Sequence, residues 1–275
     1  MCRFVAYFGE SEILMSELIS KPVNSLINQS REAREGSHAI NADGFGVGWY
    51  DFDIEATPAV YRSIMPAWND SNLRNIAAKI RSKCMVGHVR ASTVGDVTLV
   101  NSHPFKSGNH LFVHNGTIHH FADVKRRLIA ELSEEAYKDI QGQTDSEHFL
   151  ALMKTQYDAR KPFVEAAPEA FVKAIRLLDE MAEEVGVPGH MRINSIFTDG
   201  INLMATHYCS RQLDDQLSLY YSFDEKIDRQ PAARSVVVAS EPLNDFMHDW
   251  KEIPANHFLF INSLQERAVL PIDLG

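Results

Sequence analysis

The sequence predicts an α+β fold in which antiparallel sheets carry helices on their outer faces. Segments typical of strands lie mostly toward the two ends of the chain, and helical patterns fall mostly between them. Few strand–helix–strand alternations occur, so we expect hairpins rather than parallel crossovers between strands. An Asp-Gly pair at 199–200 separates two strand-like segments, which is typical of a type I′ hairpin turn.

The expected strands are short and rich in Val, Ile, Phe and Tyr, which suit a pleated and largely buried surface. They cover residues 3–8, 45–50, 59–63, 85–89, 110–114, 192–197, 202–207, 217–221, 235–239, 257–261 and 268–271. A glycine-rich stretch at 41–49 lacks the lysine of a phosphate-binding loop and runs into a strand instead of opening a helix. Alternating glycine in a strand predicts that a backbone or a ligand approaches closely.

Helices are expected at 73–80, 121–132, 146–156 and 168–185. The first has apolar residues at 73, 76, 77 and 80, which is helical spacing. We expect the last to start at Pro168 and to stop at Gly186, because proline suits the first turn of a helix and glycine suits the position after its end.

Composition is that of an ordinary globular protein of 275 residues, with 45% hydrophobic and 23% charged residues. The 27 basic and 37 acidic residues give a net charge of −10, which argues against nucleic acid or an anionic membrane as a partner. Three cysteines without CxxC spacing indicate a reducing compartment. With neither a leader pattern nor a long apolar run, we expect a cytoplasmic protein with one domain over 1–275.

Cys2 is the first candidate for chemistry because only Met1 precedes it. Initiator methionine is usually removed when the second residue is small, and the Cys2 thiol would then share a residue with a free α-amine. A free thiol has a pKa of about 8.5 and an α-amine a pKa of about 7.7–8.0, so one residue would supply nucleophile and general base. The competing interpretation is an ordinary buried cysteine at the start of a strand.

Arg90 ends the segment Gly-His-Val-Arg at 87–90, at the end of an expected strand. A guanidinium in this place could bind a carboxylate through two parallel hydrogen bonds. A surface salt bridge is the alternative, and that interpretation is favoured when the segment is taken alone.

Asn115 and Gly116 follow an apolar run in the segment His-Asn-Gly. The Asn115 amide and the Gly116 N–H could form an oxyanion hole, in which one donor contributes about 2.7–4 kcal/mol to the transition state. An Asn-Gly pair normally forms a hairpin turn, and that interpretation is favoured when the segment is taken alone.

Asp145 lies in the segment Thr-Asp-Ser-Glu at 144–147, just before an expected helix. Its carboxylate could bind a substrate ammonium. Taken alone, the segment is more typical of a helix cap, formed by Thr144 or Asp145.

Five of the 12 histidines lie at 103, 110, 114, 119 and 120, which raises a metal-dependent hydrolase as an alternative. Metal ligands must converge in space. His119 and His120 are adjacent and would point to opposite faces of an extended chain. No HExxH or CxxC pattern accompanies them, so we expect neither a metal nor another cofactor.

Together these segments resemble the class II, N-terminal-nucleophile glutamine amidotransferases. That family carries an N-terminal cysteine and then GHxR, HNG and TD[ST]E segments, which match Cys2, 87–90, 114–116 and 144–147 in the same order. Asn-Ser-His-Pro at 101–104 is similar to a further stretch of the family. Segments 41–50, 61–68 and 240–243 look like its stand-alone branch, which includes the γ-glutamyl hydrolase of ergothioneine synthesis, so the resemblance covers nearly the whole chain.

The resemblance implies a four-layer αββα sandwich and cleavage of a γ-glutamyl amide, such as glutamine, through a cysteine thioester. It implies that the substrate α-carboxylate binds to an arginine and the α-ammonium to an aspartate. The positions that it assigns are the nucleophile Cys2, the oxyanion donors Asn115 and Gly116, and the substrate-binding residues Arg90, Thr93 and Asp145.

The chain departs from the larger family members at Ala91 and Val94, where they carry tryptophan and histidine. We therefore expect a different pocket wall, with room for leaving groups larger than ammonia. The family's His-Arg-Gly segment has no clean match, since Arg31 and Arg34 both lie in that region. We expect no synthase domain after this unit, so either any ammonia acceptor is a separate protein or the reaction ends in plain hydrolysis. A non-catalytic module that binds glutamine or a γ-glutamyl metabolite is the alternative function.

Overall fold

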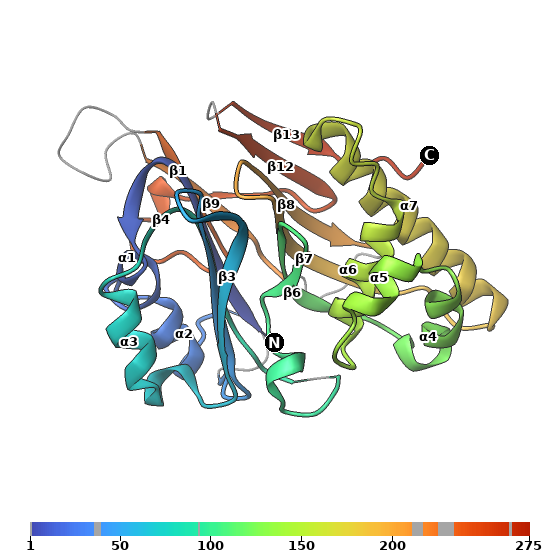
Figure 1. Ribbon diagram of the computed structural model, residues 1–275, viewed down its shortest axis with the longest axis horizontal. Helices are drawn as coiled ribbons and strands as arrows, with labels where there is room; N and C mark the ends of the chain where they lie inside the picture. Colours follow the sequence, from blue (N-terminus) through green and yellow to red (C-terminus); the bar gives the residue numbers. More distant parts are fainter. Residues whose placement is uncertain (1, 36–39, 93, 211–216, 225–233, 264–265) are drawn as a thin grey trace.

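Two antiparallel sheets lie face to face at the centre of the molecule (Figure 1). The computed structural model describes residues 2–35, 40–92, 94–210, 217–224, 234–263 and 266–275. In this part of the chain the first sheet has the strand order β11-β9-β10-β1-β4-β2-β3, and the second has the order β13-β12-β8-β7-β6-β5. The strands are β1 (Arg3–Leu14), β2 (Phe45–Asp51), β3 (Glu55–Ser63), β4 (Arg81–Val89), β5 (Phe105–Ser107), β6 (His110–Ile118), β7 (Met191–Thr198), β8 (Asn202–Cys209), β9 (Tyr220–Asp224), β10 (Ser235–Ala239), β11 (Lys251–Glu252), β12 (His257–Asn262) and β13 (Arg267–Pro271).

Helices cover the outer face of each sheet (Figure 1). On the first sheet lie α1 (Ser16–Ile19), α2 (Leu26–Arg31) and α3 (Ser71–Ala77). On the second lie α4 (Phe121–Ala130), α5 (Glu134–Asp139), α6 (Asp145–Gln156) and α7 (Phe163–Glu184). Short 3₁₀ turns are η1 (Ala67–Asn69), η2 (Leu99–Asn101) and η3 (Met247–Asp249). The helices in the described part of the chain are all too short or too polar to cross a membrane.

Strand β1 shows why the layers number four. Phe4, Ala6 and Phe8 pack between the sheets, whereas Val5 and Tyr7 pack against the helices of the first sheet. Successive side chains of a strand point to opposite faces, so a strand that is apolar at every position must be covered on both sides. A third apolar cluster joins the outer face of the second sheet to α4, α6 and α7. The αββα sandwich implied by the resemblance is thereby confirmed.

The start of α7 differs from the prediction, since the helix begins at Phe163 and contains Pro168. Phe163 is buried in the core, and this burial favours a helix that starts before the proline. Pro168 has no N–H to donate to the carbonyl of Val164, but Val164 is exposed and water can reach it. The predicted stop is confirmed: Gly186 has a φ of +71° and donates to the Glu183 carbonyl just past the last turn.

The β7–β8 hairpin is confirmed, but its predicted type I′ turn is wrong. A type I′ turn needs positive φ at both of its central residues, which here are Gly200 and Ile201. Only Gly200 has a positive φ, at +84°, because the β-branched Ile201 would be strained there. The Asp199 carboxylate holds the turn by accepting the N–H groups of Ile201 and Asn202.

Other boundaries moved because tertiary contacts compete with strand pairing. Strand β9 begins three residues later than expected, since the carbonyls of Leu217 and Ser218 accept hydrogen bonds from the Asn194 side chain. Strand β1 continues past Phe8 through a bulge in its pairing with β4. The described elements that the sequence did not reveal are short: α1, α2, α5, β5, β11, η1, η2 and η3.

The predicted close approach at the glycine-rich strand is confirmed. A Cβ on Gly46 would lie 2.1 Å from the carbonyl oxygen of His103, so this backbone segment rests directly on β2. The His103 ring is buried against the His88 ring at 4.2 Å and the Phe105 ring at 4.5 Å. Neither nitrogen of the His103 ring has a hydrogen-bond partner within the described residues. Burial lowers the pKa of His103 well below its ordinary value.

We predict that acidification destabilises the protein partly through His103. Below about pH 6.5 the unfolded chain binds a proton at this residue that the folded chain excludes, so the free energy of unfolding falls as the pH decreases. His103→Phe keeps a ring of similar shape and removes the titration. Denaturant unfolding at several pH values should show a slope that is smaller by about 1.4 kcal/mol per pH unit below pH 6 in the variant. Equal slopes would contradict this assignment.

Candidate active site

Cys2 lies beside Arg90 and Ala91 because of the pairing of two central strands. Strand β1 runs antiparallel to β4 with Arg3 opposite Val89, so the residue before β1 meets the residues that follow β4. The Cys2 sulfur lies 3.3 Å from the backbone nitrogen of Ala91 and 3.4 Å from its carbonyl oxygen. The thiol is therefore held at one point by the backbone of the neighbouring strand end.

The surroundings of Cys2 change the pKa of its thiol in opposite directions. Burial is the largest effect and raises the pKa of the Cys2 thiol, because it disfavours the thiolate. The Ala91 N–H, the positively charged chain terminus, Arg90 and Arg3 all pull this pKa down, without cancelling the effect of burial. Burial thus favours the protonated thiol, and attack on a substrate requires a base that removes the proton.

Arg90 is buried, so the surface salt bridge expected from the segment alone is wrong. Its guanidinium holds the following loop together by donating to the Ser92 hydroxyl and to the carbonyls of Val94, Gly95 and Asp96. Asp43 supports the same loop through the Ser92 N–H at 2.7 Å. Thr93 lies outside the described residues.

Asn115 and Gly116 lie inside strand β6, so the hairpin turn favoured by the segment alone is also wrong. Strand β7 pairs with both residues and carries β6 on to Ile118. The Asn115 Oδ1 is buried and has no hydrogen-bond partner within the described residues. A ring nitrogen of His88 lies 3.3 Å from the His114 carbonyl oxygen, which links β6 to β4 across the two sheets.

Asp145 joins the start of α6 to the end of β6. Its carboxylate accepts the Ile118 N–H at 2.9 Å and the Ser146 N–H at 2.9 Å. The helix cap is Thr144, whose hydroxyl accepts the Glu147 N–H, as one of the two predicted alternatives stated. The Asp145 charge also acts on the Arg90 guanidinium, which places this carboxylate near the loop beside Cys2.

The structure thus brings Cys2, Arg90 and Asp145 into one region, with the His-Asn-Gly segment linked to it through His88. A cavity of about 800 Å³ lies elsewhere, between edge strands β3 and β5, and none of these residues lines it. Among the five clustered histidines, the His110 ring stacks on Phe197, and the His103 ring lies against His88. Among the described residues, no group of three or more His, Cys, Asp or Glu side chains is placed to hold a metal ion.

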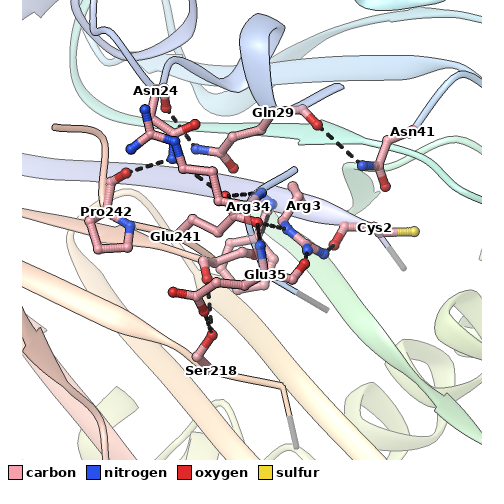
Figure 2. Close-up of polar contacts among 12 residues, drawn as sticks. Cys2, Arg3, Asn24, Gln29, Arg34, Glu35, Asn41, Ser218, Glu241 and Pro242 are labelled. Carbon is pink, nitrogen blue, oxygen red and sulfur yellow. Dashed lines mark hydrogen bonds and ion pairs between the residues drawn. The ribbon is translucent and has the colours of Figure 1, made fainter. Parts of the chain in front are cut away.

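Arg3 and Glu241 form a buried ion pair next to Cys2 that the sequence analysis did not identify (Figure 2). Glu241 belongs to the segment 240–243, which was noted only for its resemblance. The available signal was an arginine at the start of an otherwise apolar strand, since an unpaired arginine is rarely buried.

Two stacked antiparallel sheets, with a cysteine at the start of a central strand, form the arrangement implied by the resemblance to the N-terminal-nucleophile enzymes. Comparison with known proteins gives the same answer. The family model for class II glutamine amidotransferases matches residues 14–269. The chain belongs to this family, and the protein is an enzyme of the glutamine amidotransferase and γ-glutamyl hydrolase type.

Three relatives illustrate the similarity. The probable glutamine amidotransferase DUG3 of Saccharomyces cerevisiae is 33% identical and is covered over 82% of its length by 95% of this chain. The γ-glutamyl-hercynylcysteine sulfoxide hydrolase of Mycolicibacterium smegmatis is 29% identical over 94% of this chain and 95% of its own. A glutamine aminotransferase class-II domain protein from Silicibacter pomeroyi has a solved structure that superposes with a TM-score of 0.71 at 25% identity, covering 98% of this chain and 99% of that one.

We predict that Gly116→Ala removes activity by displacing the strand at the site. The new Cβ would lie 1.9 Å from the Arg192 carbonyl oxygen, so the backbone must move and take its N–H with it. Loss of one oxyanion donor typically lowers kcat by about 10²–10³-fold. Glutamate release from L-glutamine and from γ-glutamyl amides measures the effect. Gly108→Ala is the control for backbone strain away from the site, because its φ of +57° disfavours alanine although its Cβ would meet no atom within 4 Å. Wild-type kcat in Gly116→Ala would refute the expectation.

Proposed function

We propose that the protein cleaves the γ-amide bond of a γ-glutamyl compound through a thioester on Cys2. The single observation that carries the proposal is the position of the Cys2 thiol, half-buried at the start of a central strand and within 3.4 Å of the Ala91 backbone, beside the Arg90 loop. Once Met1 is removed, the α-amine of Cys2 is the base that a protonated thiol requires.

The proposed reaction runs in two steps. The Cys2 sulfur attacks the γ-carbonyl carbon, and the thiol proton passes to the α-amine. Asn115 and Gly116 donate hydrogen bonds to the oxyanion, the carbon–nitrogen bond breaks, and the α-amine gives its proton to the leaving amine. Water then attacks the thioester, releases the γ-carboxylate of glutamate and restores the thiol.

Charge complementarity supports a glutamyl substrate. We propose that Arg90 binds the α-carboxylate and Asp145 the α-ammonium, with Thr93 lining the same pocket. The two charged side chains are buried and lie in one region of the site. The Arg90 guanidinium now donates hydrogen bonds to the carbonyls at 94–96. To bind a substrate carboxylate, it must give up some of these hydrogen bonds or divide them between the carbonyls and the carboxylate.

The acyl acceptor and the setting of the reaction are part of the same proposal. The M. smegmatis relative is named as a hydrolase of a γ-glutamyl compound with a large leaving group, and Ala91 stands here where larger family members carry tryptophan. We therefore propose hydrolysis of a γ-glutamyl amide larger than glutamine. Transfer of ammonia to a separate acceptor or synthase protein is the other route. The three cysteines, which form no disulfide within the described residues, support a cytoplasmic location.

The experiment is covalent labelling with the diazo-ketone analogue of L-glutamine. Intact mass should show loss of Met1 and one adduct, and peptide mapping should place the adduct on Cys2. Cys2→Ala should abolish both adduct and turnover while leaving the fold intact. Cys209→Ala is the matched control, because it removes another thiol outside the site, and it should label like the wild type. An adduct on another residue, or turnover by Cys2→Ala, would overturn the proposal.

A further inference from the structure

The ion pair between Arg3 and Glu241 lies directly behind the nucleophile. The Arg3 Nε is 2.6 Å from the Glu241 Oε1, and the two side chains are 2% and 1% exposed. Charged groups buried to this extent are rare, and a buried ion pair is on average no more stabilising than well-packed apolar residues of similar volume. The pair therefore calls for an explanation other than stability alone.

The other nitrogen atoms of the Arg3 guanidinium bind backbone carbonyls next to the ion pair. Its Nη1 donates to the carbonyl oxygen of Cys2 at 2.8 Å, and its Nη2 donates to the carbonyl oxygen of Glu35 (Figure 2). The Glu241 carboxylate in turn accepts the backbone N–H groups of Arg34 and Glu35, each at 3.0 Å. One ion pair thus joins the first residue of the mature chain, the loop at 34–35 and the end of β10.

An N-terminal nucleophile presents a positioning problem that this contact solves. Terminal residues are poorly ordered unless they are tied down, and after removal of Met1 only one peptide bond holds Cys2. The sulfur is held at Ala91 and the carbonyl oxygen at Arg3. With these two groups fixed, the tetrahedral Cα allows the α-amine only one direction.

We propose that Arg3, itself held by Glu241, is a positioning residue that orients the α-amine and thiol of Cys2 for proton transfer. This inference rests on the proposed function of Cys2. Lysine could not replace Arg3, because only a planar guanidinium reaches the carboxylate and two carbonyls in one plane. The Arg3 charge also pulls down the pKa of the Cys2 thiol, although burial has the larger, opposite effect.

Four variants separate orientation from charge and from stability. Each is produced with a cleavable leader that leaves Cys2 as the first residue, which intact mass verifies. Arg3→Lys keeps the charge but loses the fork of donors. Arg3→Met leaves Glu241 buried without its partner, and Arg3→Met/Glu241→Leu removes both charges together. Arg127→Met/Glu184→Leu is the control, because it deletes an exposed ion pair.

We expect kcat to fall about tenfold or more in Arg3→Lys and in the Arg3→Met/Glu241→Leu pair, with KM changed less than about twofold. The double variant should regain only part of the stability that Arg3→Met loses, because the N–H groups of Arg34 and Glu35 then lack their acceptor, and it should not regain kcat. The rate of labelling by the diazo-ketone analogue should be measured against pH. The pH at which this rate falls on the acid side should be higher in Arg3→Met/Glu241→Leu and unchanged in Arg3→Lys. The Arg127 control should match the wild type throughout.

A stable double variant with wild-type kcat would overturn the inference and leave the role of Cys2 intact. The two proposals fail separately: a wild-type protein that neither labels at Cys2 nor releases glutamate would refute the proposed function itself. Rescue of kcat by lysine would also contradict the inference, because charge alone would then be sufficient.

Discussion

The pairing of β1 with β4 is the constraint on which the rest of the site depends. It places the start of the chain at the end of a neighbouring central strand, with Arg3 opposite Val89 and Cys2 against Ala91. Both faces of β1 are buried, by the second sheet on one side and by helices on the other. A one-residue slip would exchange these faces along the whole strand, so the core fixes the position of the nucleophile.

Burial at the site determines which groups carry charge. The thiol of Cys2 has its pKa raised by burial, and burial lowers the pKa of His88 to about 3. His88 and His103 are therefore neutral, and the positive charge near the thiol comes from the chain terminus, Arg90 and Arg3. A base that belongs to the same residue suits this arrangement, since no neighbouring histidine is charged or aimed at the sulfur within the described residues.

The sequence was most informative where a segment serves a single local purpose. Apolar patterning predicted the central strands, and Gly186 predicted the end of α7, because these features follow from backbone geometry and burial alone. The errors fall where tertiary contacts override local preference. Helix α7 begins at the buried Phe163, before Pro168, and not at the proline. Asn115 and Gly116 pair with β7 and so belong to strand β6 instead of a turn.

Site residues were predictable to the extent that they lie in short ordered motifs. Cys2, Arg90, Asn115 and Asp145 are candidates proposed from motif order, and the structure gives Arg90 and Asp145 backbone contacts that no motif reveals. Arg3 and Glu241 were missed because they are far apart in the sequence and meet only through the pairing of β1 with β10. Their contact with Cys2 is visible only in the three-dimensional structure.

The most direct test of the account is to identify the acyl-enzyme by rapid quenching and mass spectrometry during turnover of a γ-glutamyl amide. The account predicts a γ-glutamyl group on the N-terminal peptide, attached to Cys2 as a thioester and formed and lost at rates consistent with kcat. Turnover without acylation of Cys2, or with the acyl group on another residue, would contradict it.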